Sequence, residues 1–80
     1  MGARLVTSKQ ERSYDAKVAY NKLIWRLRDE DGINVVIPFS GYFGLQGSIV
    51  YGNRKYCISI YETTSRYHYN KYVAIIQTTR

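Results

Sequence analysis

Tyrosine rings and positive charges gather in the second half of this chain in a pattern that suits binding of a polyanion. Six of the nine tyrosines lie between Tyr51 and Tyr72, and Glu62 is the only acid in that stretch. Lysine and arginine neutralise phosphates, and aromatic rings stack on bases. Tyrosine and arginine are also common at the hot spots of protein interfaces. The pattern therefore predicts a surface that binds nucleic acid or a protein partner.

The residues expected to form this surface are the exposed aromatic and basic residues of the same stretch. They are Tyr51, Arg54, Lys55, Tyr61, Arg66, Tyr67, His68, Tyr69 and Lys71. Four lysines and arginines would give modest affinity that depends little on base sequence. No motif of an RNP-type, KH-type or helix-turn-helix reader is present, so the pattern does not distinguish DNA from RNA.

A catalytic alternative rests on Glu62, Arg66, His68 and Tyr69. Small ribonuclease toxins place a base, a cation and an acid in similar sets on compact α+β scaffolds. Spacing alone does not bring these four side chains together, so no catalytic residue is assigned and a non-enzymatic protein is expected. One cysteine and one histidine give no metal-binding pattern, and neither a metal nor a cofactor is expected. The acids at 29–31 are interpreted as a solvated helix end.

Charge divides the chain into two unlike halves. The net charge is +6, from twelve Lys and Arg against six Asp and Glu. Positive and negative residues nearly balance in residues 1–31, whereas residues 32–80 carry five cations and one acid. Such an excess raises the local concentration of polyanions. The lone Cys57, with no signal peptide, myristoylation motif or membrane span predicted, favours a reducing, cytoplasmic location.

Helical periodicity is confined to residues 14–28. Apolar side chains recur there at i, i+4, i+7 and i+11, as expected for a helix that buries one face. They are Ala16, Tyr20, Leu23 and Leu27, with Ala19 and Ile24 beside them. Ser13 is the expected N-cap, and Gly32 is expected to end the segment. Trp25 lies off this stripe, at the edge of the core or in solvent.

Extended patterns follow Gly32 and continue to the C-terminus. The β-branched run Ile33–Ile37 predicts a strand that is buried on both sides or bulged. The glycine-rich segment 40–47 is expected to connect strands, with Phe43 and Leu45 anchoring it to the core. Gly52-Asn53 predicts a two-residue hairpin with Tyr51 opposite Arg54.

The hairpin register divides its side chains between two faces, because neighbouring strand residues point to opposite sides of a sheet. The expected core face holds Ile49, Tyr56, Ile58 and Ile60. The face expected to contact water or a partner holds Ser48, Val50, Lys55, Cys57, Ser59 and Tyr61. Tyr20 and Tyr56 are expected to lie in the core.

The last strand is predicted at 72–79, after a polar loop at 62–66. The segment 66–71 fits either a loop or the start of this strand, in which case Tyr61 would pair with Tyr67. The C-terminal strand is expected at an open edge, which allows a homodimer. Residues 1–12 are expected to form a flexible arm or an edge strand.

These elements predict one α+β domain across residues 1–80. One amphipathic helix at 13–28 is expected to pack on an antiparallel sheet of three or four strands, which a meander at 33–79 supplies.

Two functions fit this predicted domain. The first is direct binding of DNA or RNA through the exposed sheet face and the loop. The second is a protein that binds and blocks a host nucleic-acid-processing complex, similar in build to small phage or mobile-element inhibitors such as anti-CRISPR proteins. That similarity is one of size, and no residue motif carries it.

Overall fold

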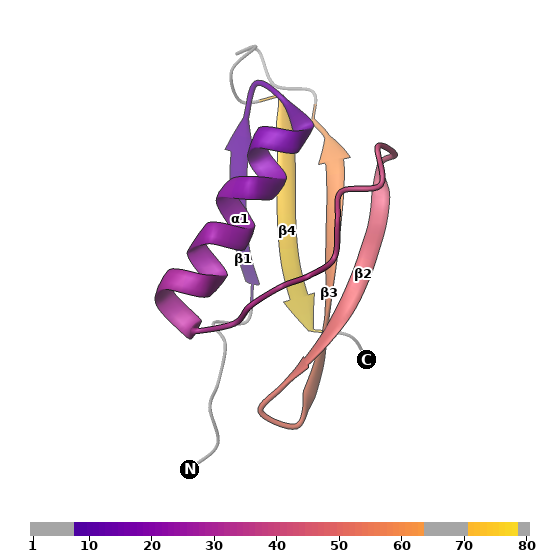
Figure 1. Cartoon of the computed structure of the whole chain (residues 1–80). Helices are drawn as coiled ribbons and strands as arrows, with labels where there is room; N and C mark the ends of the chain where they lie inside the picture. Colours follow the sequence, from indigo (N-terminus) through magenta and orange to yellow (C-terminus); the bar gives the residue numbers. More distant parts are fainter. Residues whose placement is uncertain (1–7, 64–70, 79–80) are drawn as a thin grey trace.

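One helix lies across one face of a four-stranded antiparallel sheet (Figure 1). The computed structural model describes residues 8–63 and 71–78 of the chain. The elements in chain order are β1 (Ser8–Ser13), α1 (Ala16–Asp31), β2 (Gly44–Tyr51), β3 (Arg54–Glu62) and β4 (Tyr72–Thr78). The strand order in the sheet is β1-β4-β3-β2. The predicted α+β class, with one helix on an antiparallel sheet, is therefore confirmed.

The core lies between α1 and the sheet face that it covers, called the inner face below. The helix contributes the buried side chains of Ala19, Tyr20, Leu23 and Leu27. The sheet contributes Tyr56, Ile58, Ile60, Ala74 and Ile76. The predicted apolar stripe and the predicted core positions of Tyr20 and Tyr56 are confirmed. Burial of these side chains is the main favourable term in folding of so small a chain.

The helix begins and ends three residues later than the predicted range 13–28. The N-cap is Asp15, whose carboxylate accepts hydrogen bonds from the backbone N–H groups of Lys17 at 2.8 Å and Val18 at 3.3 Å. The predicted N-cap, Ser13, is instead the last residue of β1 and pairs with Tyr72. The helix continues through Asp31, and Gly32 ends it with a left-handed φ of 67°. The predicted end at Gly32 is confirmed.

Residues 33–40 form a connecting segment without strand pairing, so the predicted strand at Ile33–Ile37 is wrong. Its odd-numbered side chains, from Ile33 to Phe39, pack against the core. Val36 between them is 83% exposed, which excludes burial on both sides. The segment lies in the same layer as α1, over the inner face (Figure 1). A chain in that layer has no neighbouring strand with which to form a ladder.

The β2–β3 hairpin has the predicted turn and register. Gly52 and Asn53 have φ values of 58° and 66°, as a type I′ turn requires and as glycine and asparagine tolerate best. Tyr51 pairs with Arg54, and the pairing continues to Ser48 opposite Cys57. The side chains of Tyr56, Ile58 and Ile60 are buried in the core.

The first half of β2 departs from the prediction. A register shift lies between Leu45 and Gly47, and Leu45 pairs with Ser59 on the face away from the helix. Leu45 is 65% exposed, so the prediction that it anchors the chain to the core is wrong. Phe43 stacks on Tyr72 with ring centroids 5.9 Å apart. Ile37 closes the core here: a Cβ atom at Gly47 would lie 2.8 Å from the end of the Ile37 side chain, so a larger residue requires that side chain to shift.

The position of β4 overturns the prediction of an open C-terminal edge. β4 lies between β1 and β3 and is paired on both sides. The edges of the sheet are β1 and β2, so a dimer through β4 is excluded by its pairing. Tyr61 pairs with Val73, and not with Tyr67 as the longer-strand alternative required. The edge-strand alternative for the N-terminal region applies to β1, while residues 1–7 lie outside the described residues.

A buried lysine joins β1 to the end of α1. Lys9 is 4% exposed. Its Nζ lies 3.0 Å from Glu30 Oε1 and also contacts Asp31 Oδ2. Burial alone would lower the pKa of Lys9, but hydrogen bonds to Asp31 and Glu30 outweigh it and raise the pKa. The interpretation of 29–31 as a merely solvated helix end is therefore wrong for Glu30 and Asp31, because both hold Lys9.

Replacement of Lys9 by methionine is expected to lower the free energy of unfolding by about 3 kcal/mol, because it leaves the largely buried Asp31 carboxylate without its ammonium partner. Urea denaturation measures the change. The matched control is Lys22→Met on the exposed side of α1, which is expected to change stability by less than about 0.5 kcal/mol. Equal effects of the two variants would show that the ion pair contributes nothing.

Stability is also expected to depend on the ionisation of Glu30. Hydrogen bonds from Lys9 and Arg26 lower the pKa of Glu30 below its ordinary value. A carboxylate with a lowered pKa stabilises the fold above its ordinary pKa, and this contribution is lost as the pH falls through the lowered value. Urea unfolding of Glu30→Gln between about pH 7 and about pH 3 should therefore show a weaker loss of stability on acidification than the native chain. An unchanged pH profile would contradict this role.

Candidate binding surface

The sheet face away from α1, called the outer face below, carries no helix (Figure 1). Strand alternation and the observed register assign residues to it. They are Gln10 and Arg12 of β1, Val73, Ile75 and Gln77 of β4, Lys55, Cys57, Ser59 and Tyr61 of β3, and Leu45, Ser48 and Val50 of β2. Ser59 and Val73 are buried near its centre, and the exposed side chains surround them. The predicted division of the hairpin between two faces is confirmed.

Acidic side chains are absent from the outer face among the described residues. All six acids of the chain fall within residues 8–63, so their positions are known. Glu11 and Glu62 occupy inner-face positions, opposite Ala74 and Tyr72. The other four, Asp15, Asp29, Glu30 and Asp31, belong to α1 or its N-cap. Among the described residues the outer face carries two cationic side chains, Arg12 and Lys55, whereas the helix side carries both signs.

Arg54 and Lys55 both lie at the hairpin end of β3. Both are exposed, and they line a hollow of about 380 Å³ together with Asn53 and Thr78. Guanidinium, ammonium, amide and hydroxyl groups are all hydrogen-bond donors. This set of donors suits a phosphate or carboxylate group.

Tyr61 and Lys71 lie near the other end of β3, roughly 20 Å along the strand from Lys55 at 3.3 Å per residue. Tyr61 is 46% exposed on the outer face. The Nζ of Lys71 lies 3.9 Å from Glu62 Oε1 and 5.9 Å from the centre of the Tyr72 ring. Glu62 therefore offsets part of the positive charge of Lys71.

Tyr51 does not belong with the other predicted binding residues. It occupies the inner face beside Ile49, packs against the core, and its hydroxyl donates to the backbone carbonyl of Asp31 at 3.4 Å. Its ring supports the hairpin and is not presented on the outer face. Tyr51 thus lies apart from the predicted binding residues of the outer face, because strand alternation turns it toward the helix.

Four predicted residues lie outside the described part of the chain: Arg66, Tyr67, His68 and Tyr69. Of the four residues considered for ribonuclease chemistry, only Glu62 is described, and it pairs with Lys71. No group of three or more potential metal ligands occurs among the described residues.

Arg12 is a member of the positive outer face that the sequence pattern did not indicate. It is exposed and sits on β1, opposite Val73. The segment Ser8–Ser13 is polar throughout, so it lacks the apolar alternation by which strands are recognised. The charged residues of this segment are its one feature that indicates a strand, since charged residues are common on edge strands.

Two aliphatic side chains are exposed on the same face. Val50 is 75% exposed and Leu45 is 65% exposed, both on β2. Neither stacks on a base as an aromatic ring does, and both fit an apolar contact with protein. The outer face is thus positive at Arg12 and Lys55 and apolar along β2.

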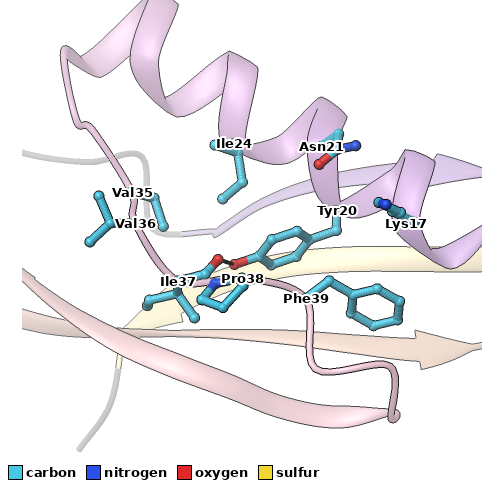
Figure 2. A pocket seen from close by; sticks show the side chains of 9 residues that line it. All are labelled: Lys17, Tyr20, Asn21, Ile24, Val35, Val36, Ile37, Pro38 and Phe39. Carbon is cyan, nitrogen blue, oxygen red and sulfur yellow. Dashed lines mark hydrogen bonds between the residues drawn. The ribbon is translucent and has the colours of Figure 1, made fainter.

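A second concave surface lies on the helix side of the molecule. A groove of about 500 Å³ separates α1 from residues 35–39 (Figure 2). Its walls are mainly apolar, with Lys17 and Asn21 at its polar side. Tyr20 reaches across from α1 and donates a hydrogen bond to the backbone carbonyl of Ile37, and its ring lies 6.0 Å from that of Phe39. These contacts hold the connecting segment on the helix.

Replacement of Tyr20 by phenylalanine is expected to lower the free energy of unfolding by about 1–2 kcal/mol, because the partly buried Ile37 carbonyl loses its donor. Tyr14→Phe is the matched control, since Tyr14 is largely exposed. Urea denaturation of both variants measures the difference. Equal stability of the two variants would show that the hydroxyl contributes nothing to the groove.

Comparisons with known proteins assign no function to the outer face. Family models, curated proteins and solved structures gave no match to this chain. Within the described residues, α1 falls short of the length and apolarity that a membrane-spanning helix needs.

Proposed function

We propose that this protein is a small non-enzymatic module that binds nucleic acid through the outer face of its sheet. The observation that carries the proposal is the position of the six acidic side chains, all of which lie away from that face, while Arg12 and Lys55 lie on it. A polyanion gains attraction from such a face without approaching an acid.

The arrangement of the cations fits an extended strand better than a compact ligand. Arg54 and Lys55 lie at the hairpin end, and Arg12 lies beside Val73 near the opposite end of the sheet. The exposed ring of Tyr61 lies in the same row as Arg12, since Val73 pairs with both residues. Phosphates would contact the two ends, and a base would stack on Tyr61. Contacts of this type recognise backbone and ring faces and give little base specificity.

A second candidate is supported by Val50 and Leu45. Their exposed aliphatic side chains add an apolar strip to the positive face. A protein with an acidic, partly apolar surface would use both properties, as an inhibitor that blocks a nucleic-acid-processing complex requires. For this candidate the binding free energy would come mainly from apolar contacts, whereas for nucleic-acid binding it would come mainly from the cations.

Fluorescence anisotropy with short labelled single- and double-stranded DNA and RNA, titrated across salt, tests the proposal. We expect binding that survives physiological salt. Arg12→Ala and Lys55→Ala should each weaken it and reduce the slope of log affinity against log salt by about 1. The charge-matched control is Lys22→Ala, which removes one cation from the exposed side of α1 and should leave the slope unchanged.

Two outcomes would contradict nucleic-acid binding as the function. Equal losses in all three variants would mean that net charge alone drives association. Binding that vanishes by about 0.15 M salt would mean the same. The inhibitor would then be the better candidate, and replacement of Val50 and Leu45 by serine should abolish binding to its protein target with the cations intact.

A further inference from the structure

The two edges of the sheet differ in their protection against pairing with another strand. β1 carries Lys9, Glu11 and Arg12 within six residues, and Lys9 points inward to the helix. Charged and inward-pointing residues are devices that prevent edge-to-edge pairing. β2 has eight residues and none of them is charged. β2 is therefore the edge open to pairing.

Residues 47–51 form the regular half of that edge. The register shift between Leu45 and Gly47 interrupts the first half of β2, and pairing with β3 is continuous from there to Tyr51. In an antiparallel ladder, residues that exchange hydrogen bonds with the partner strand alternate with residues that do not. Tyr51 closes the two-residue turn with Arg54, so Ser48 and Val50 direct their backbone N–H and C=O groups to the open edge.

We infer that two copies of this chain pair through β2 in antiparallel orientation, with a two-fold axis at Ile49. This register places Ser48 of one copy opposite Val50 of the other and uses the whole regular segment from Gly47 to Tyr51. Every other antiparallel register that pairs as many residues includes either residues of the irregular first half of β2 or residues of the turn after Tyr51. A two-fold arrangement needs a self-complementary surface, and an uncharged strand meets that need without like-charge repulsion.

The side chains on both faces of β2 favour the same arrangement. On the inner face, the partly buried Ile49 meets its symmetry mate at the axis. On the outer face, Val50 is 75% exposed in one copy and lies opposite Ser48 of the other, with Val50 of the other copy at the diagonal position. The two sheets become one sheet of eight strands, and their outer faces form one surface. The inference concerns self-association and does not depend on the proposed ligand.

Sedimentation equilibrium from micromolar to millimolar protein tests the pairing. The native chain is expected to dimerise, and Ser48→Lys is expected to weaken the dimer about tenfold or more, because it places a charge at the centre of the pair. The matched control is Gln10→Lys, which makes a similar change at an exposed outer-face position of β1 and should have no effect. Ser48 is exposed, so both variants are expected to fold.

Disulfide cross-linking tests the register. Chains with Ser48→Cys and chains with Val50→Cys, each with Cys57→Ser, are expected to link when mixed under air oxidation, while each alone links much less. A native chain that stays monomeric at all concentrations would overturn the inference. So would a dimer that Ser48→Lys leaves intact, or one in which each cysteine variant links with itself as readily as with the other.

Discussion

The arrangement of the sheet depends on the buried ammonium of Lys9. β1 contributes no large apolar side chain to the core, so its ladder with β4 and the contacts of Lys9 with Glu30 and Asp31 hold it in place. A buried charge is tolerated only when it is paired. The pair therefore fixes the end of α1 against the first strand. Because β1 occupies that edge, β4 becomes an interior strand and β2 remains as the uncharged edge.

The helix alone does not cover the inner face. α1 packs chiefly on β1 and β4, and residues 33–40 complete the layer over the remaining strands. Tyr20 joins the two parts of this layer through Ile37, and Ile37 in turn lies close against Gly47 of β2. Helix, connecting segment and hairpin are thus linked by a short chain of contacts.

This layering separates the charges of the chain. The six acidic side chains lie in the helical layer or at inner-face positions, and three of them, Glu30, Asp31 and Glu62, pair with Lys9, Arg26 and Lys71. The described residues place no second layer and no acidic side chain on the outer face. A face of this kind repels other cations and attracts a polyanion. Val50 is exposed at the open edge of β2. Pairing of two copies at this edge would join two such faces and raise the number of cations available to one ligand.

The sequence by itself determined the local features: the helix stripe, its end at Gly32, the hairpin at Gly52-Asn53, its register, and the split of its side chains between two faces. Each depends on residues close in the chain, through helical spacing, turn geometry or strand alternation. Only the tertiary structure decided the features that join distant segments. These are the pairing of the polar strand β1 with β4 and the placement of residues 33–40 in the helical layer. Strand order and layer membership are decided by competition for the same buried surface, which a local pattern does not record. Arg12 lies on the outer face for this reason alone, since its strand has no apolar alternation and is placed by pairing with Val73, sixty-one residues further along the chain.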